Sequence, residues 1–369
     1  EPVVTIFHFD LPLALEEKYG SWRDRRMMDS YVNYCKVLFE NFKDDVNYWL
    51  TYNEQNMLIF FGAVDMMGGT FKRNDLNDLY NQAHIQIVAQ AKAIHLCHEM
   101  CPHAKIGPAP NITTAYPKTC DPKDQIAAYN MDDLRNNFYL DPLVFGTYPK
   151  SVNTYFENHH IKLEIEDGDM ELLRSCHPDF IGFNCYGNDT VEALDFYEMD
   201  YGIFEGADNR DLSYLKALMD KPGVGKSVEN DKFPKGEDGH SFDPYCIRVT
   251  ARRLSDRYHL PLIITENGYG RADTLEDDGT IHDSYRIDYL RDHIQAMHDA
   301  VSLDGVELWG FTPWGCIDLV SASTGEMHKR YGFVYVDYQD DGTGNGNRIR
   351  KDSFYWYKKV IASNGEDLK

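Results

Sequence analysis

Six short apolar runs recur along this chain, and long amphipathic stretches separate most of them. Continuous apolar runs suit strands that are buried on both faces, and apolar side chains repeated at helical spacing suit helices that cover such strands. Strand and helix in alternation predict parallel βα units. The runs are Val3–Phe9, Val46–Tyr52, Lys105–Pro110, Asp179–Asn184, Pro261–Glu266 and Val306–Trp314, and the stretches are Asp29–Lys43, Asn74–Glu99, Pro244–Tyr258 and Ser284–Val301.

The six runs fall two short of the strands that a closed (βα)8 barrel needs. The first run begins at residue 3, almost at the start of the chain. We therefore expect an α/β fold, a TIM barrel in one domain over residues 1–369, with the first two βα units missing from this chain. The apolar share of 43% is enough for its core. The Gly- and Asn-rich segment Asp340–Asn347 predicts a hairpin turn, and the polar segment Leu194–Asp243 predicts long loops over the barrel rim.

The charge balance argues against two classes of partner. The chain has 60 acidic residues against 37 Lys and Arg, a formal net charge of −23. Nucleic acids and anionic membrane surfaces favour basic patches, so we expect neither as a partner. The eight cysteines lack the short spacing of a disulfide framework, which predicts free thiols in a reducing compartment. The sequons at Asn111 and Asn188 would matter only in a secreted protein.

Two of the strand candidates end in a polar residue followed by a glutamate. One reads Thr-Tyr-Asn53-Glu54, and the other reads Ile-Thr-Glu266-Asn-Gly. In parallel βα folds the working residues sit at the carboxyl ends of strands, and a carboxylate there is costly to desolvate unless it is paired or used. Helix N-caps or surface salt bridges are the alternative. Two glutamates at matching places favour an acid/base or acid/nucleophile pair.

Two further patterns have both a structural and a functional interpretation. Trp314 ends the last strand candidate, where its ring can either face a sugar or pack in the core. Within the Cys- and His-rich run 95–103, Cys97 and Cys101 would share a helix face with His98 beside them. This mixed spacing is uncommon among metal sites, and such residues in a long barrel helix are usually structural, so we expect no metal.

The two glutamate motifs resemble those of glycoside hydrolase family 1, the retaining β-glycosidases on a (βα)8 barrel, and the resemblance runs from His8 to near the C-terminus. In that family a Thr-x-Asn-Glu motif carries the acid/base and an Ile-Thr-Glu-Asn-Gly motif carries the nucleophile, which implies these roles for Glu54 and Glu266. His8 lies in His-Phe-Asp-Leu-Pro, similar to the family's His-[Trp/Phe]-Asp-x-Pro element. The resemblance implies that His8 contacts sugar hydroxyls and that Asn53 hydrogen-bonds the 2-hydroxyl.

A third element of the family, Phe-x-Gly-x-Asn-x-Tyr, is similar to Phe180–Tyr186. It implies that Tyr186 hydrogen-bonds the nucleophile and that Asn184 lines the site. A retaining mechanism needs the two carboxyl groups about 5–5.5 Å apart.

The substrate class depends on the segment that follows Trp314. Ordinary members of the family read Asp-Asn-Phe-Glu-Trp where this chain has Asp318–Ala322, and their Glu binds the sugar's 4- and 6-hydroxyls. Ser321 stands at that position, which removes a carboxylate that would repel a 6-phosphate. Together with Lys329 and Tyr331 it resembles the phosphate pocket of the 6-phospho-β-glycosidase branch. The alternative is that the three are plain loop residues.

Two neighbours of this segment refine the expectation. Alternation along the chain points Arg330 away from the pocket and into a structural salt bridge. Galactosidase-type members carry Trp where this chain has Ala322, so the resemblance favours glucosides.

The activity that the resemblance implies is retaining hydrolysis of 6-phospho-β-D-glucosides, such as phosphorylated cellobiose or aryl β-glucosides, to glucose 6-phosphate and the aglycone. It implies no cofactor. In the family such substrates come from sugar import coupled to phosphorylation, which implies a bacterial cytoplasm. A plain β-glucosidase and a catalytically impaired, truncated phosphosugar-binding remnant stay open as alternatives.

Two family residues from the first two strands have no counterpart here, namely a Gln that binds the sugar and an Arg beside the nucleophile. The Arg helps to keep the nucleophile ionised. We therefore expect these 369 residues alone to be poorly active or inactive, and to need a partner fragment or a homo-oligomer contact that covers the open barrel. Addition of the missing segment should then raise activity and thermal stability.

Overall fold

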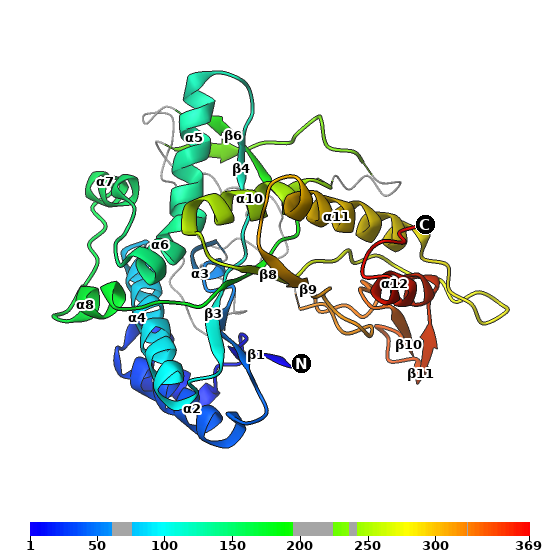
Figure 1. Cartoon of the computed structure of the whole chain (residues 1–369), viewed down its shortest axis with the longest axis horizontal. Helices are drawn as coiled ribbons and strands as arrows, with labels where there is room; N and C mark the ends of the chain where they lie inside the picture. The colour runs from blue at the N-terminus through cyan, green and yellow to red at the C-terminus, as the bar shows by residue number, and fades with distance from the viewer. Residues whose placement is uncertain (61–75, 195–223, 236–241, 323) are drawn as a thin grey trace.

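Six parallel strands form the centre of the molecule. The computed structural model describes residues 1–60, 76–194, 224–235, 242–322 and 324–369 (Figure 1). One set of three pairs in the order β1-β2-β3 and another in the order β5-β8-β9. The strands are β1 (Val3–Phe7), β2 (Tyr48–Asn53), β3 (Lys105–Ala109), β5 (Ile181–Asn184), β8 (Leu262–Glu266) and β9 (Leu308–Phe311).

Strands β3 and β5 join the two sets into one curved sheet. The backbone N–H of Asp179 donates to the carbonyl of Ile106 over 2.9 Å, and that of Asn184 donates to Pro110 over 2.9 Å. A parallel bridge between Asn111 and Asn184 continues the pairing beyond the strand ends. All six predicted strands are therefore confirmed, in the predicted order and with the predicted parallel sense.

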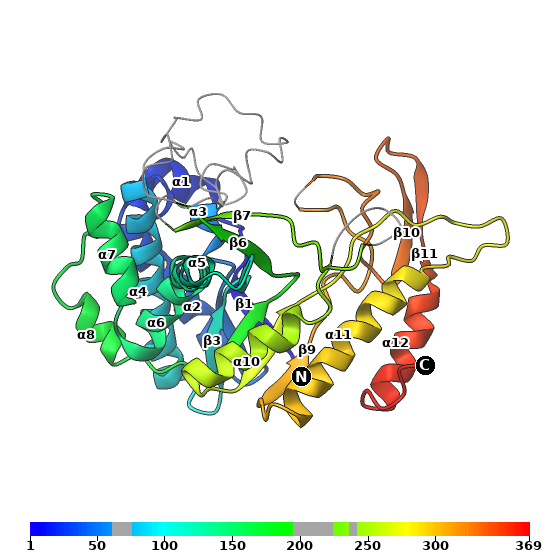
Figure 2. The ribbon, with the colours of Figure 1, turned by 90° about the horizontal axis from the view of Figure 1, so that it is seen from above.

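The predicted helices form as amphipathic covers of this sheet. In Figure 2 the helices α4, α6, α10 and α11 follow one another round the outside of the strands. Each buries its apolar face, as in the run of fully buried Ala and Ile side chains on α4. The principal helices are α2 (Arg26–Phe42), α4 (Leu76–Met100), α5 (Pro122–Asp132), α6 (Phe138–Phe145), α10 (Cys246–Tyr258), α11 (Ser284–Ser302) and α12 (Asp352–Ala362).

Shorter helical segments complete the outer layer. They are α1 (Leu13–Tyr19), η1 (Ser21–Arg23), α3 (Met57–Phe60), η3 (Asp133–Asn137), α7 (Lys150–Asn158) and α8 (Asp169–Arg174). η3 is a π-helical turn that joins α5 directly to α6, and such turns are rare and often lie at functional sites.

Aromatic side chains fill the floor of the barrel. The ring centroid of Tyr48 on β2 lies 6.1 Å from that of Trp309 on β9, and the ring of Phe180 lies 5.5 Å from Trp309. The N-terminus lies beside β9 in both views (Figures 1 and 2). Among the described residues no strand pairs with the outer edges of β1 and β9, and Trp309 is 38% exposed there.

Five further strands lie outside the central sheet. β10 (Val334–Tyr338) and β11 (Gly344–Arg350) form the antiparallel hairpin predicted at Asp340–Asn347, although half of that segment belongs to β11 rather than to the turn. A second small sheet of β4 (Ala115–Pro117), β6 (Asp189–Ala193) and β7 (Gly225–Ser227) was not predicted. Most of the predicted rim loops, residues 195–223 and 236–241, lie outside the described residues.

The structure also describes the state of the cysteines and the apolar character of the helices. All eight cysteines are unpaired, and six of them are buried. In the described part of the chain, no helix combines the length and the apolar character needed to cross a membrane.

Candidate active site

Glu54 lies immediately after β2, in a backbone conformation that aims its side chain into the barrel mouth. Its φ is 47°, in the left-handed region that non-glycine residues seldom adopt outside functional sites and tight turns. Its N–H donates to the carbonyl of Ala109 over 2.8 Å, which ties this turn to the end of β3. The Oε1 atom accepts two amide hydrogen bonds, from Asn111 Nδ2 over 2.8 Å and from Asn184 Nδ2 over 2.9 Å.

Glu266 is the last residue of β8, and its side chain is 12% exposed. The Tyr186 hydroxyl donates to Glu266 Oε2 over 2.8 Å. The imidazole Nε2 of His8 lies 3.9 Å from Glu266 Oε1, and His8 is the only basic side chain within 4.0 Å of this carboxylate among the described residues. Because burial lowers the pKa of His8, the ring is neutral near pH 7 and supplies no counter-charge.

Asn184 connects the two glutamates. Besides Glu54, its amide Nδ2 contacts Asn53 Oδ1 over 3.0 Å, and its Oδ1 accepts from the Thr265 hydroxyl over 2.6 Å. Asn53 Nδ2 in turn lies 3.2 Å from His8 Nε2, where the neutral ring accepts the hydrogen bond. The ends of β2, β5 and β8 thus carry one continuous polar network that includes six predicted site residues, namely His8, Asn53, Glu54, Asn184, Tyr186 and Glu266.

The electrostatics of the site centre on Glu266. Burial, followed by the negative charge of Glu54, raises the pKa of Glu266 from 4.5 to about 8, and the hydrogen bonds from Tyr186 and Asn184 oppose this rise. The two carboxyl groups lie on one polar network, because Asn184 hydrogen-bonds Glu54 and His8 lies beside Glu266. Burial and the Glu266 charge together raise the pKa of Tyr186 above its ordinary range, so its hydroxyl stays protonated and keeps donating.

Trp314 lies beside this network rather than in the core. It is half-buried, and its ring centroid is 6.0 Å from that of His8 with an interplanar angle of 23°. Its N–H donates to the carbonyl of Asn267 over 2.7 Å, which fixes the segment after β9 against the segment after β8. One ring face is therefore available at the barrel mouth.

The predicted phosphate residues occupy one loop after β9. Ser321 is buried, and a tight turn is closed by hydrogen bonds from Ser321 N–H to the Glu326 carbonyl and from Gly325 N–H to the Ser321 carbonyl. The Lys329 Nζ lies 5.6 Å from the ring centroid of Tyr331. The Tyr331 ring packs so closely on Gly270 that a Cβ at Gly270 would lie 2.5 Å from it. This contact places Tyr331 against Gly270, which follows Glu266 by four residues in the sequence.

A buried ionic network holds this loop in place. Arg286 Nη1 donates to the carbonyls of Tyr269 and Tyr331, over 2.7 and 2.8 Å. Lys351 Nζ donates to Asp273 Oδ2 over 2.5 Å and to Asp318 Oδ1 over 2.8 Å. The side chains of the network are at most 2% exposed, and its charges balance; the members are Asp273, Asp283, Asp318, Arg286, Arg330 and Lys351.

The prediction for Arg330 is confirmed within this network. Arg330 Nη1 lies 3.1 Å from Asp318 Oδ2 and also donates to the carbonyl of Val336. Its guanidinium is therefore engaged in the buried network and not in the phosphate pocket that was predicted around Lys329.

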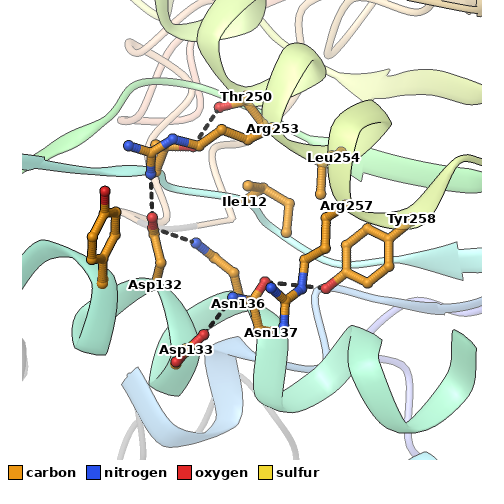
Figure 3. Close-up of a pocket in the computed structure, with 12 residues that line it drawn as sticks. Ile112, Asp132, Asp133, Asn136, Asn137, Thr250, Arg253, Leu254, Arg257 and Tyr258 are labelled. Carbon is orange, nitrogen blue, oxygen red and sulfur yellow. Dashed lines mark hydrogen bonds and ion pairs between the residues drawn. The ribbon is translucent and has the colours of Figure 1, made fainter. Parts of the chain in front are cut away.

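A cavity of about 350 Å³ lies between η3 and α10, and none of the predicted site residues lines it (Figure 3). Arg253 pairs with Asp132 in this cavity (Figure 3), and Arg257, which also lines it, pairs with Asp141. Burial raises the pKa of Asp132 to about 6. The polar network at the strand ends and this cavity thus lie at separate places in the molecule.

The Cys- and His-rich run lies on α4 and the turn that follows it. His98 Nε2 contacts Asp179 Oδ2 over 2.9 Å, and the thiols of Cys97 and Cys101 are buried. Throughout the described ranges, His, Cys, Asp and Glu side chains form no group of three that could hold a metal ion.

Sequence analysis missed two residues next to Glu54. Asn111 follows a strand just as the glutamates do, so the strand-end rule that found Glu54 could have found it. Arg135, whose Nη2 donates to Asn111 Oδ1 over 3.1 Å, reaches the site from η3. Nothing in the sequence signals a π-helical turn there.

Comparison with known proteins agrees with this geometry. The profile of glycosyl hydrolase family 1 matches residues 1–366. The chain is 41% identical to the aryl-phospho-beta-D-glucosidase BglH of Bacillus subtilis, over all of this chain and 74% of that protein, and 41% identical to the 6-phospho-beta-glucosidase AscB of Escherichia coli, over all of this chain and 73% of that protein. It is 33% identical to a 6-phospho-beta-galactosidase of Leptotrichia buccalis, over 98% of this chain and 76% of that protein.

Solved structures of the family have the same fold. The family 1 beta-glucosidase of Thermotoga maritima superposes with a TM-score of 0.82 at 31% identity, over 99% of this chain and 74% of that chain. The fold is thus that of the family's TIM barrel, as predicted. With a profile match over nearly its whole length and relatives at about 40% identity, this chain belongs to glycosyl hydrolase family 1.

Proposed function

We propose that this protein hydrolyses 6-phospho-β-D-glucosides, with retention of anomeric configuration, to glucose 6-phosphate and the aglycone. The observation that carries the proposal is the polar network that joins Glu54 and Glu266, at the ends of β2 and β8, through Asn184, Asn53 and His8. Relatives named as aryl-phospho-beta-D-glucosidases, 6-phospho-beta-glucosidases and a phospho-cellobiase support the substrate class.

Glu266 is the nucleophile in this proposal. Its carboxylate forms a bond to the anomeric carbon while the glycosidic C–O bond breaks, and Glu54 gives its proton to the departing oxygen. A water molecule then loses a proton to Glu54, attacks the anomeric carbon and releases Glu266. Tyr186 holds Glu266 Oε2, which leaves Oε1 for attack.

The polar network around the glutamates binds the sugar. His8, Asn53 and Asn184 present ring and amide groups to its hydroxyls, and Trp314 offers a flat face on which an apolar sugar face packs. Hydrogen bonds to the 2-hydroxyl that tighten at the transition state supply several kcal/mol in retaining glycosidases.

Ser321, Lys329 and Tyr331 bind the 6-phosphate. A sugar phosphate carries about −1.5 to −2 charges, and a protein with a net charge of −23 repels it at long range. Lys329 supplies the local cation, and the hydroxyls of Ser321 and Tyr331 donate to phosphate oxygens.

Glucosides are favoured over galactosides because the position of Ala322 leaves room that a Trp would fill. The phospho-glucosidase relatives named above are more similar to this chain than the phospho-galactosidase is. A phosphorylated sugar and unpaired thiols both fit a bacterial cytoplasm, where we place the protein.

The test compares 4-nitrophenyl 6-phospho-β-glucoside with unphosphorylated 4-nitrophenyl β-glucoside. We expect kcat/KM to be at least about 100-fold higher for the phosphorylated compound, because loss of a charged hydrogen-bonding partner costs about 3 kcal/mol. The variant Lys329→Ala should lose most of that preference, whereas Lys358→Ala, an exposed lysine on α12, should keep it.

Three results would contradict parts of the proposal. Equal rates on both compounds would favour a plain β-glucosidase. Binding of glucose 6-phosphate by calorimetry, without release of nitrophenol at any pH, would favour a phosphosugar-binding protein. An α-anomeric first product, observed by proton NMR, would exclude retention.

A further inference from the structure

The two oxygens of the Glu54 carboxyl group have different surroundings. Oε1 accepts hydrogen bonds from the amides of Asn111 and Asn184, over 2.8 and 2.9 Å. In the described part of the chain, no donor contacts Oε2. An oxygen that already accepts two donors is a poor place for a proton, because an O–H there would face two N–H groups. The carboxylic proton therefore belongs on Oε2.

This arrangement depends on which way the Asn111 amide faces. An amide has one accepting and one donating end, and rotation by half a turn about its terminal bond would present Oδ1 to Glu54 instead of Nδ2. Oδ1 would then accept a proton from Oε1, so a rotated amide would draw the proton to the wrong oxygen. Something must hold the amide in its observed orientation.

Arg135 is the group that does so. One hydrogen of its Nη2 points to Asn111 Oδ1 over 3.1 Å, and Nη2 also donates to the Thr113 hydroxyl over 2.7 Å. A guanidinium has only donors, so the amide end that faces Arg135 must be the oxygen. Asn56 fixes the backbone of the same residue, since its side chain pairs with both the N–H and the carbonyl of Asn111.

Asn184 is held less strictly. Its Oδ1 faces the Thr265 hydroxyl, and a hydroxyl can either donate or accept. The orientation of Asn184 is therefore compatible with its observed role but is not imposed by Thr265. Asn184 Nδ2 also donates to Asn53 Oδ1, but the Asn53 amide can itself rotate, so of the two amides on Oε1 only Asn111 faces a group that has donors alone.

The position of Arg135 suits this task. It lies in the π-helical turn η3 and is 6% exposed. Burial lowers the pKa of Arg135 only to about 10, so the side chain remains charged and purely donating at neutral pH.

We propose that Arg135 is a positioning residue, which fixes the Asn111 amide so that the proton of Glu54 resides on Oε2, the oxygen left open toward the leaving group. The inference rests on the acid role proposed for Glu54. Arg135 contacts neither substrate nor the reacting atoms in this proposal; it acts only through Asn111.

The kinetic test uses substrates that differ in their need for a proton. A 2,4-dinitrophenyl group leaves without protonation, whereas a phenyl group needs the acid, and general acid catalysis is worth about 10²–10⁴-fold. For Arg135→Met we expect kcat/KM to fall about 10- to 100-fold more on phenyl 6-phospho-β-glucoside than on its 2,4-dinitrophenyl analogue. Arg135→Lys, which keeps a purely donating head group, should recover part of the loss on the phenyl compound.

The control is Arg257→Met. Arg257 donates to Asp141 and lines the cavity on the outer side of η3, so its loss loosens the same helices without touching Asn111 (Figure 3). It should lower the rates on both substrates equally. If Arg135→Met also lowers them equally, Arg135 is merely structural and the proposal is overturned.

A neutron structure of the unliganded protein in acid, with its carboxyl groups protonated, tests the idea without turnover. We expect a deuteron on Glu54 Oε2 and amide deuterons of Asn111 that face Oε1. A deuteron on Oε1, or an Asn111 oxygen that faces Glu54, overturns the proposal even if the protein hydrolyses nothing. Absence of hydrolysis together with the expected deuterons would instead count against the proposed function and support the inferred positioning.

Discussion

Replacement of Glu266 by the neutral isostere Gln should raise the free energy of unfolding at alkaline pH and leave that free energy unchanged in acid. Glu266 is buried without a permanently charged cation within 4.0 Å in the described structure, and its pKa is raised from 4.5 to about 8 by burial first and by Glu54 second. The folded protein therefore holds a proton that the unfolded chain releases between these two pH values.

The sign follows from proton linkage. Between pH 4.5 and 8 the unfolded state binds fewer protons than the folded state, so the free energy of unfolding falls as pH rises. At 1.36 kcal/mol per pH unit, the difference between 4.5 and about 8 amounts to about 5 kcal/mol. The loss is absent below pH 4.5 and complete above pH 8.

The assay is urea unfolding of the wild type and Glu266→Gln at several pH values. The free energy of unfolding of the variant, minus that of the wild type, should grow from near zero at pH 4.5 to about 5 kcal/mol at pH 9. Titrating groups that do not interact with Glu266 cancel in this difference. In a Glu54→Gln background one cause of the raised pKa is gone, so the same comparison should give a smaller difference. A difference that stays constant with pH would refute the reasoning.

The same property constrains catalysis. Catalysis needs one proton on the pair, carried by Glu54 while Glu266 is ionised, so kcat/KM should fall as pH rises through about 8, where the pair loses its last proton.

Three further changes test other parts of the site. Tyr186→Phe removes a hydrogen bond that lowers the pKa of Glu266, so the alkaline fall in kcat/KM should move to higher pH, and kcat/KM at pH 7 should drop about tenfold because the ionised nucleophile loses a donor. Lys351→Met leaves the two buried Asp carboxylates that it contacts with an unbalanced charge, and urea unfolding should show a loss of about 3–5 kcal/mol. Gly270→Ala places a methyl group against the ring of Tyr331, so KM should rise for phosphorylated substrates and change little for plain glucosides.

The sequence predicted the strands and helices of the barrel because each carries a long, regular pattern. The helix expected over Asp29–Lys43, for example, spans Arg26–Phe42, and the last predicted strand ends early at Phe311. The small sheet of β4, β6 and β7 escaped prediction because its strands have three to five residues and no alternation. Such strands form only where neighbouring backbone is already in place.

Part of the candidate site could also be predicted from the sequence. Glu54 and Glu266 could be found because each stands at the end of an apolar run, and such runs are visible in the sequence. Arg135 could not be found this way, since its approach to Asn111 depends on one π-helical turn and on contacts between segments 24 residues apart. Groups that act through another residue leave no local pattern in a sequence.

In the proposed function, the buried ionic network helps a strongly acidic protein to keep its phosphate pocket open. Lys329 must stay available for a ligand, yet carboxylates are abundant throughout the chain. Two carboxylates of the loop's framework, Asp273 and Asp318, are already paired with Lys351, Arg286 and Arg330, and these side chains are at most 2% exposed. Because these charges cancel inside the fold, they neither attract Lys329 inward nor repel a dianion at close range. The network therefore contributes to phosphate binding by neutralising the loop's own acids, although none of its members needs to touch the phosphate.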